Sequence, residues 1–401
     1  ILTLLTSFLP HVDGVQLYDF KQNGGALVGS GLLSYVDTNG KLLSTDRTWE
    51  VIKNYNIGLD FGFLDNRLTG TAELFWKKCN NMLIDVTYPG TLGDKAPTAN
   101  RGSFKANGWE GTINWSDKIG EISYHLGGTF TYTTNKLVDN GGDAVIKSGV
   151  VSNREGYPLN SVFGLKYCGK IQTQDQLDKY INQYANGNNN IAMPGNLRLG
   201  DNMYEDVNKD GKLTEADYVY LGTDDPKVSF SFNAGLSWKG FDVSVIFQGA
   251  GKRTVWRGGE NNQKGKNDNW RIPMMSWYNN STNQSVGNVW SAETPNAHYP
   301  TYTHQTQINL YNYICSSWSV EDGAYLRLKN VTLGYTFPAN VLSKTKFISY
   351  ARIYVSGADL WENSKIKDGW DPEASRKVET FGRYPFTRNL TVGLNKYSYT
   401  D

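Results

Sequence analysis

The clearest pattern in the chain is an alternation of apolar and polar residues with a period of two. In residues 226–239 the apolar set is Val228, Phe230, Phe232, Ala234, Leu236 and Trp238, and small or polar residues lie between them. Successive side chains of a β-strand point to opposite faces, so this pattern predicts a strand with one apolar and one polar face. The pattern recurs, with some exceptions, in 51–63, 66–78, 101–115, 120–134, 240–251, 324–337, 346–360 and 384–397. Weaker candidates are 26–36 and a segment near 12–20.

The lengths of these segments and of their connections favour a membrane protein. Most of the segments have about 11 to 15 residues, whereas strands of soluble sheets have about 5 to 6 and a transmembrane strand needs about 9 to 11. Short turns are expected at 65–66, 116–119, 239–240 and 338–345, and long polar connections at 79–100, 135–225, 252–323 and 361–383. Outer-membrane barrels alternate short periplasmic turns with long extracellular loops. We therefore expect an all-β, transmembrane antiparallel β-barrel.

Composition and charge exclude several other classes. With 40 Lys+Arg and 39 Asp+Glu, the net charge is +1, which argues against binding to nucleic acid by bulk charge. No apolar run approaches the roughly 20 residues of a transmembrane helix. The three cysteines, Cys79, Cys168 and Cys315, lie far apart and predict neither a disulfide scaffold nor a zinc site, although their pairing stays open. The four histidines are scattered, so we expect no enzyme activity.

Seven segments carry motifs that occur together in one known family. They are NRLTGTAELFWKKCNNML (66–83), NRGSFKANGWEGTINW (100–115), EGYPLNSVFGLKYCGKIQ (155–172), LGDNMYEDVNKDGKLTEADYVYLGTDDPK (199–227), KGFDVSVIFQGAGK (239–252), AYLRLKNVTLGYTFP (324–338) and YPFTRNLTVGLNKY (384–397). In this order they resemble the SusC/RagA family of TonB-dependent outer-membrane transporters. The resemblance implies that residues 1–401 are the C-terminal part of the barrel domain, about the last ten of 22 strands. The signal peptide, TonB box, plug and N-terminal barrel half would lie outside this sequence.

The resemblance also implies a function, a location and partners. The protein would import oligosaccharides, other glycans or peptides across the outer membrane of a Gram-negative bacterium. It would act with a SusD-like surface lipoprotein, and with TonB through the missing N-terminal region. The alternatives are another outer-membrane receptor or passive pore, and a soluble glycan-binding β-protein. The soluble alternative would bury the apolar strand faces against each other instead of against lipid.

One segment of the long 135–225 connection has the spacing of a calcium-binding loop. Residues 206–217 read DVNKDGKLTEAD. Oxygen ligands would come from positions 1, 3, 5, 7 and 12, with a water-linked contact from Thr214 at position 9, and glycine at position 6 permits the sharp turn. The expected ligands are Asp206, Asn208, Asp210, the Lys212 carbonyl and Asp217. We predict a lone Ca²⁺ loop; the alternative is a turn held by hydrogen bonds without metal.

The connection at 252–323 is rich in aromatic residues. Sugars can stack their apolar C–H faces on flat rings, and neighbouring amides can bond sugar hydroxyls. The candidate ligand-binding rings are Trp256, Trp270, Trp277, Tyr278 and Trp290. The alternative for any single ring, which we favour, is that it forms the core which a long ordered loop requires.

Overall fold

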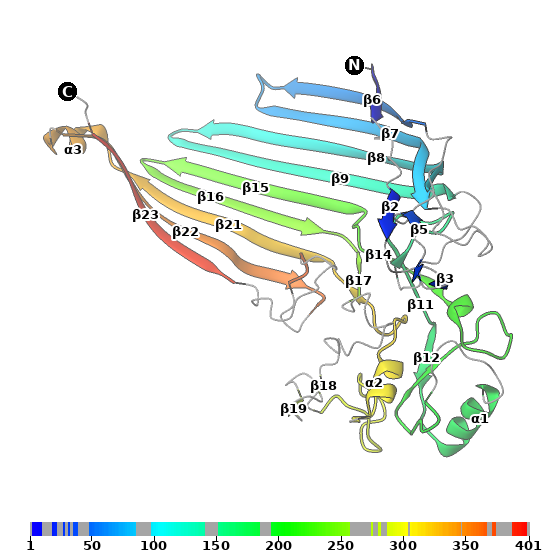
Figure 1. Cartoon of the computed structure of the whole chain (residues 1–401). Helices are drawn as coiled ribbons and strands as arrows, with labels where there is room; N and C mark the ends of the chain where they lie inside the picture. Colours follow the sequence, from blue (N-terminus) through cyan, green and yellow to red (C-terminus); the bar gives the residue numbers. More distant parts are fainter. Residues whose placement is uncertain are drawn as a thin grey trace.

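A ten-stranded antiparallel sheet dominates the chain. The computed structural model describes residues 2–9, 18–21, 27–28, 31–32, 35–38, 48–85, 98–140, 151–184, 194–256, 274–275, 280–281, 287–303, 305–345, 347–366, 371–373 and 387–398. In spatial order the strands are β1 (Leu2–Leu9), β6 (Glu50–Phe63), β7 (Leu68–Asp85), β8 (Thr98–Ile119), β9 (Ile122–Asn140), β15 (Val228–Trp238), β16 (Phe241–Ala250), β21 (Tyr325–Thr336), β22 (Ile348–Ser364) and β23 (Asn389–Ser398). Each strand pairs with its neighbour along this order, and the sheet twists and curves across its width (Figure 1). The all-β fold class is confirmed.

Short and long connections lie at opposite ends of the sheet, as the sequence predicts. The turns between β6 and β7, β8 and β9, β15 and β16, and β21 and β22 lie at one end, on the left in Figure 1. The last of these turns contains α3 (Ala339–Leu342) and the 3-10 helix η5 (Ser343–Thr345). The strand ends that the long connections join lie at the other end: Asp85 and Thr98, Asn140 and Val228, Ala250 and Tyr325, and Ser364 and Asn389. Within the described residues, no helix is long and apolar enough to cross a membrane.

Two expectations about strand positions are wrong. The tenth strand is β1, which pairs with β6 from Leu2 opposite Ile57 to Leu9 opposite Glu50, and not 26–36. Gly29 and Gly31 interrupt the 26–36 run, and its described residues belong to two short strand pairs. The first is β3 (Leu27–Val28) with β4 (Gly31–Leu32). The second is β5 (Tyr35–Thr38) with β2 (Tyr18–Lys21), so the described residues of the segment near 12–20 lie outside the ten-stranded sheet.

The turn predicted at 116–119 is also displaced. Strand β8 continues to Ile119, which lies opposite Ile122, and the chain reverses at Gly120 and Glu121. Gly120 has a φ of +60°, a conformation that suits glycine. The polar residues Ser116 to Lys118 resemble a turn in sequence, but they pair with β9 as the end of a long strand.

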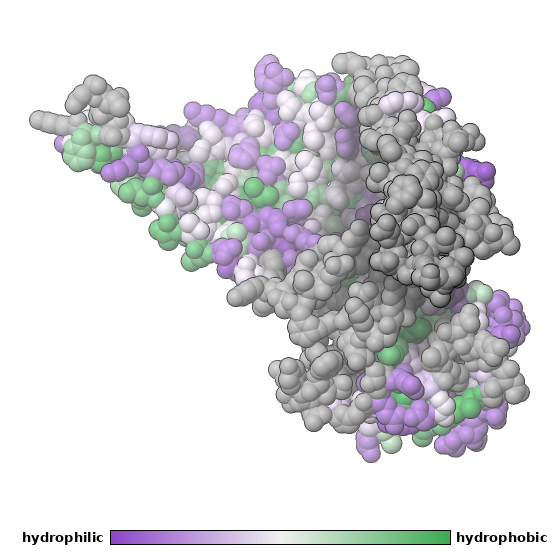
Figure 2. Space-filling model, viewed as in Figure 1, coloured by the Kyte–Doolittle hydropathy of each residue, from purple (hydrophilic) through white to green (hydrophobic). Residues whose placement is uncertain are grey.

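The two faces of the sheet differ as the period-two pattern predicts. Apolar side chains gather on one face and remain exposed there, among them Leu59, Ile113, Phe232, Leu333, Val355, Leu390 and Val392. Val392 keeps 77% of its surface exposed and Leu390 keeps 72%. Figure 2 shows hydrophobic residues along the edge formed by β22 and β23. A face of this kind needs an apolar environment, which a bilayer supplies.

A separate lobe is built from the two longest connections and lies beside the long-connection end of the sheet (Figure 1). It contains β10 (Val151–Ser152), β11 (Ser161–Gly164) and β14 (Val219–Thr223) in one sheet, and the pairs β12 (Tyr167–Lys170) with β13 (Asn202–Tyr204), β17 (Thr254–Val255) with β20 (Glu321–Asp322), and β18 (Met274–Met275) with β19 (Asn280–Ser281). Its helices are α1 (Gln174–Tyr184), η2 (Glu215–Asp217) and α2 (Thr306–Asn312).

The lobe has its own hydrophobic core, which is rich in tyrosine. Helix α1 buries Leu177, Tyr180 and Tyr184, at a spacing that places them on one helical face. They pack with Phe163, Leu165, Ile171, Leu197, Tyr204, Leu213, Tyr218 and Tyr311. Because Tyr311 comes from the second long connection and the rest from the first, the two connections fold as one unit.

Candidate functional site

A continuous row of hydrophilic side chains crosses the polar face of the sheet. Residues directly opposite each other on neighbouring strands form the series Asp60, Thr71, Thr112, Thr129, Ser231, Gln248, Arg327 and Glu362. The hydroxyls of Thr71 and Thr112 lie 2.8 Å apart, and those of Thr129 and Ser231 lie 2.7 Å apart. This face can hydrogen-bond water and hydrophilic solutes, as the lumen of an outer-membrane barrel does.

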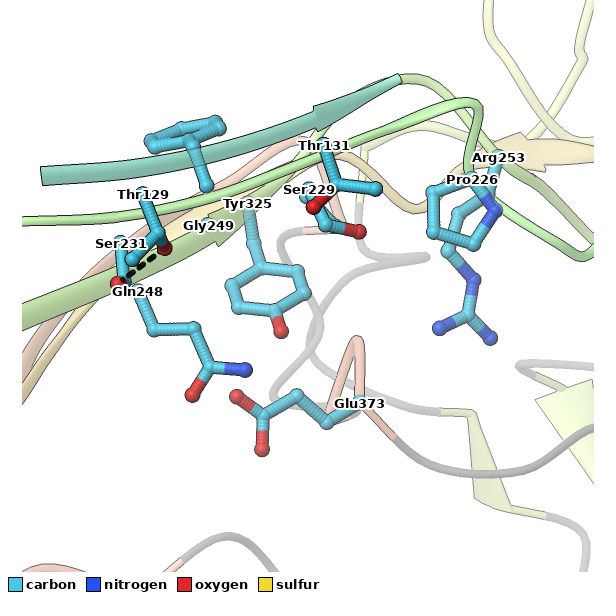
Figure 3. Close-up of a pocket in the computed structure, with 12 residues that line it drawn as sticks. Thr129, Thr131, Pro226, Ser229, Ser231, Gln248, Gly249, Arg253, Tyr325 and Glu373 are labelled. Carbon is cyan, nitrogen blue, oxygen red and sulfur yellow. Dashed lines mark hydrogen bonds between the residues drawn. The ribbon is translucent and has the colours of Figure 1, made fainter. Parts of the chain in front are cut away.

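A cavity of about 620 Å³ lies against this row near the long-connection end of the sheet. Its lining consists of Thr129, Thr131, Pro226, Ser229, Phe230, Ser231, Gln248, Gly249, Ala250, Arg253, Tyr325 and Glu373. Figure 3 shows the Gln248 amide, the Tyr325 hydroxyl and the Glu373 carboxylate converging on one space. The volume is that of a small-molecule site. An amide, hydroxyls and a carboxylate beside an aromatic ring suit a hydrogen-bonding ligand.

The carboxylate of Glu373 reaches the cavity from the connection between β22 and β23. Arg327 on the sheet binds it, with Nη1 of Arg327 3.1 Å from Oε2 of Glu373. The same guanidinium contacts Asp371 at 2.7 Å and Glu362, and its side chain is only 1% exposed. Lys329 adds an ion pair to Glu373 at 3.1 Å and one to Asp359 at 3.2 Å. Four acidic groups thus surround two cations and hold residues 371–373 against the polar face.

A second ion pair, at the rim of the cavity, joins the two long connections that form the lobe. Both Nε and Nη2 of Arg253 donate to Oδ1 of Asp224, at 3.1 Å and 2.6 Å. Asp224 lies near the end of the first long connection and Arg253 near the start of the second. The ion pair therefore holds the two connections together where they leave the sheet. Thr254 donates from its hydroxyl to the Leu221 carbonyl at 3.0 Å and strengthens the same junction.

The predicted calcium loop forms a tight turn held by its own carboxylates. Asp206 accepts the Gly211 N–H at 2.7 Å, and the fully buried Asp217 accepts the N–H groups of Val207 at 2.9 Å and Thr214 at 2.8 Å. Gly211 has a φ of +77° and Leu213 is buried in the core of the lobe, as positions 6 and 8 require.

The donor set of the loop is rich in the oxygen ligands that Ca²⁺ prefers. In this structure, however, the carboxylate oxygens of Asp206 and Asp217 accept hydrogen bonds from backbone N–H groups of the loop. Among the described residues no three His, Cys, Asp or Glu side chains gather closely enough to hold a metal ion. The geometry of the loop therefore leaves both predictions open, the metal site and the metal-free turn.

The aromatic candidates divide between the core and residues outside the described part of the chain. Trp256 is 5% exposed and packs with Val162 and Cys315 inside the lobe. Trp290 is half-buried, and its indole N–H donates to Gln172 Oε1 at 2.8 Å. Trp270, Trp277 and Tyr278 lie outside the described residues. For Trp256 the arrangement favours the packing alternative over direct contact with a ligand.

The residues that line the cavity were not identified from the sequence. The period-two pattern places Ser231 on the polar face, and the same parity would place Gln248 and Arg327 there. Nothing in the sequence indicates that Glu373, more than 100 residues from Gln248, returns to this face. The pairing of Arg327 with three carboxylates depends on strand order and on the path of the β22–β23 connection.

Comparisons with known proteins agree with this geometry. TonB-dependent receptor P26 of Formosa agariphila is 26% identical over 379 residues, which cover 89% of this chain and 36% of the relative. TonB-dependent receptor SusC of Bacteroides thetaiotaomicron is 23% identical over 379 residues, 90% of this chain and 33% of the relative. The chain therefore spans about a third of the length of these relatives. No family model matches the chain.

Solved structures show the same fold. The RagAB peptide importer in the open-open state matches 99% of this chain and 40% of its own with a TM-score of 0.72 and 18% identity. A second structure of the RagAB peptide transporter matches with a TM-score of 0.68 and 19% identity, over 98% of this chain and 40% of the other.

The fold, the two faces and these likenesses define part of a TonB-dependent β-barrel of the outer membrane. Within that class the resemblance to the SusC/RagA family, stated from the sequence motifs, is confirmed.

Proposed function

We propose that the protein containing this chain imports a hydrophilic nutrient across the outer membrane by TonB-dependent transport. One observation carries the proposal: a polar row crosses the sheet and borders a cavity lined by Gln248, Tyr325 and Glu373, on the face opposite the exposed apolar side chains. Such a face conducts or binds hydrophilic solutes. The named relatives are receptors of the TonB-dependent class.

The substrate class that the cavity supports best is an oligosaccharide or other glycan. Its hydroxyl, amide and carboxylate groups can bond sugar hydroxyls, and the Tyr325 ring offers a flat apolar surface. A peptide is the second candidate, because the structural relative RagAB is a peptide importer. The rings of Trp270, Trp277, Tyr278 and Trp290 remain proposed ligand contacts.

We propose two protein partners. A SusD-like lipoprotein would sit over the long-connection end of the sheet, where the lobe supplies the surface. TonB would act through a region of the protein outside this chain. Calcium at 206–217 would stabilise the lobe, since the loop's Leu213 packs into its core. No catalytic role is proposed, because the relatives are receptors and transporters.

Uptake by living cells tests the proposed function. The strain that produces the full-length protein would be compared with its deletion mutant, using size-defined fluorescent oligosaccharides and peptides separately. We expect the deletion to abolish energy-dependent uptake of one class. A Gln248→Ala, Glu373→Gln double variant should lower uptake, while Lys179→Ala on the exposed side of α1 should not. Equal uptake of both classes by wild type and deletion mutant would contradict the proposal.

A further inference from the structure

Four lysines on adjacent strands form a row on the apolar face of the sheet. Lys53 of β6 lies opposite Lys78 of β7, Lys78 opposite Lys105 of β8, and Lys105 opposite Lys136 of β9. All four side chains are exposed. With neighbouring strands about 4.8 Å apart, the row spans roughly 14 Å.

The parity of these positions places the row on the lipid-facing side. On β6, Lys53 lies two residues from Tyr55 and four from Ile57. On β7, Lys78 lies two residues from Trp76 and four from Leu74. All four neighbours are exposed and apolar. The strand alternation puts them on the same face as the lysines. The row therefore lies toward the long-connection ends of the strands, with most of the exposed apolar side chains on its short-turn side and Trp49 and Val138 beyond it.

Without a ligand, the lysine row destabilises the sheet. Like charges directly opposite each other on paired strands repel. Within the described part of the chain, none of the four lysines has an ion pair or hydrogen bond to a side chain that would compensate. By contrast, Lys329 on the opposite face has two acidic partners and Lys239 pairs with Glu121. Four ammonium groups in one line, without an acidic partner among the described residues, are a binding surface for an anion.

We propose that this lysine row binds the phosphate groups of a phosphorylated lipid in the outer leaflet. The position of the row indicates the ligand. The acyl chains of a lipid would lie along the apolar side chains on the short-turn side of the row, and its phosphates would contact the ammonium groups of the row. Lysine side chains can lie along apolar surface while their charged ends reach the headgroup level. Charge-assisted hydrogen bonds to phosphate oxygens are strong, and they offset the repulsion within the row. The long-connection end corresponds to the cell exterior in such barrels.

Lipid binding by the purified full-length protein tests this proposal. Native mass spectrometry would measure retention of bisphosphorylated lipid A by the wild type and by a variant with Lys53, Lys78, Lys105 and Lys136 all replaced by Gln. We expect affinity to fall on the order of tenfold or more in the variant, since each lysine contributes to the attraction. The four-residue Lys→Arg variant, which keeps the charge, should retain binding.

Two controls separate the headgroup from other causes. A charge-matched variant with Lys118, Lys179, Lys344 and Lys396 replaced by Gln changes exposed lysines elsewhere and should bind as wild type does. Dephosphorylated lipid A should bind wild type as weakly as bisphosphorylated lipid A binds the Gln variant. Inorganic phosphate at equal concentration should not displace the lipid, because it lacks the acyl chains.

The proposal fails if the Gln variant retains lipid A with wild-type affinity, or if dephosphorylated lipid A binds equally well. Should the four-residue Gln variant not fold, a Lys78→Gln, Lys105→Gln variant that changes only the two central charges would give the same comparison with a smaller loss. Lipid binding needs no substrate and no energy source. Its outcome is therefore independent of whether the protein imports a glycan, a peptide or neither.

Discussion

Phe232 and Ser231 are neighbours in the chain but face different surroundings. Phe232 keeps 43% of its surface exposed on the apolar face, while Ser231 bonds Thr129 on the polar face at the cavity. The strand alternation alone separates them. A side chain on this sheet is thus assigned to lipid or to the lumen by the parity of its position.

Introducing a charge at Phe232 tests this assignment. Phe232→Arg should lower the free energy of unfolding in lipid vesicles by about 2–4 kcal/mol, because a cation near the middle of the bilayer loses its hydration. Urea titration of the protein folded into vesicles would measure the change. Ser229→Arg, on the exposed polar face of the same strand, should cost far less. Equal effects of the two variants would count against a lipid-facing Phe232.

The calcium prediction also belongs to single residues. Asp206 occupies position 1 of the loop and accepts two backbone N–H groups, from Asp210 and Gly211. Asp206→Ala should abolish saturable Ca²⁺ binding in a calorimetric titration, because it removes a charged ligand and loosens the turn. Lys209→Ala changes position 4, which supplies no ligand, and should leave binding intact. If Asp206→Ala titrates as the wild type does, the loop is the metal-free turn.

The lobe depends on buried polar contacts between its two connections. The Tyr180 hydroxyl lies 2.6 Å from the Tyr311 hydroxyl and accepts the Tyr204 N–H at 2.9 Å. The Asn202 side chain donates to the Asn312 carbonyl at 2.8 Å, and Asn312 donates to Asp201 at 2.8 Å. Burial raises the pKa of the Tyr180 hydroxyl well above its usual range, so it stays protonated and available as a donor.

Removing that hydroxyl should loosen the lobe without disturbing the sheet. Tyr180→Phe leaves the Tyr204 N–H buried without its acceptor, at a cost of about 1–3 kcal/mol. Amide hydrogen exchange should then become faster in α1 and β13, with β15 and β16 unchanged. Tyr157→Phe, at a half-exposed ring, serves as the control. Unchanged exchange in α1 would show that this contact does not stabilise the lobe.

The ion pairs that hold residues 371–373 against the sheet make a second prediction for this part of the fold. Arg327→Gln leaves Glu362, Asp371 and Glu373 gathered without their buried cation, which should cost about 3–5 kcal/mol in the free energy of unfolding. The exposed pair of Lys365 with Asp322 should contribute at most about 1 kcal/mol, so Lys365→Gln is the control. Denaturant unfolding would measure both. A loss as small as that of the control would mean that Arg327 does not anchor the segment.

The strands were largely predictable from the sequence, and the cavity was not. Alternation and connection length are local signals, so nine of the strand segments and the alternation of short and long connections follow from them. Strand β1 was missed because its apolar run, Leu2 to Leu9, lacks a clear period, and its role depends on pairing with β6. The cavity depends on Glu373 meeting Arg327 across the chain, which no local pattern encodes.

At the scale of the whole molecule, the sheet has the fold of part of a larger TonB-dependent barrel, and the lobe lies beside its long-connection end. The chain matches 33–37% of the curated relatives' length, and 99% of it matches the RagAB importer structure, which covers 40% of that chain. The polar face, the lobe and the lysine row then occupy the positions expected of a lumenal wall, an extracellular surface and a lipid boundary. All three assignments depend on which face of the sheet meets the bilayer.

Spin-label scanning of β15 measures that orientation most directly. Each residue from Val228 to Trp238 would be replaced in turn by a labelled cysteine, in the full-length protein with its native cysteines replaced by alanine. In lipid bilayers, labels at even positions should be accessible to oxygen and labels at odd positions to a water-soluble nickel complex, with a period of two. Accessibility without that period, or even positions shielded from both reagents inside a water-soluble protein, would contradict the membrane orientation and everything derived from it.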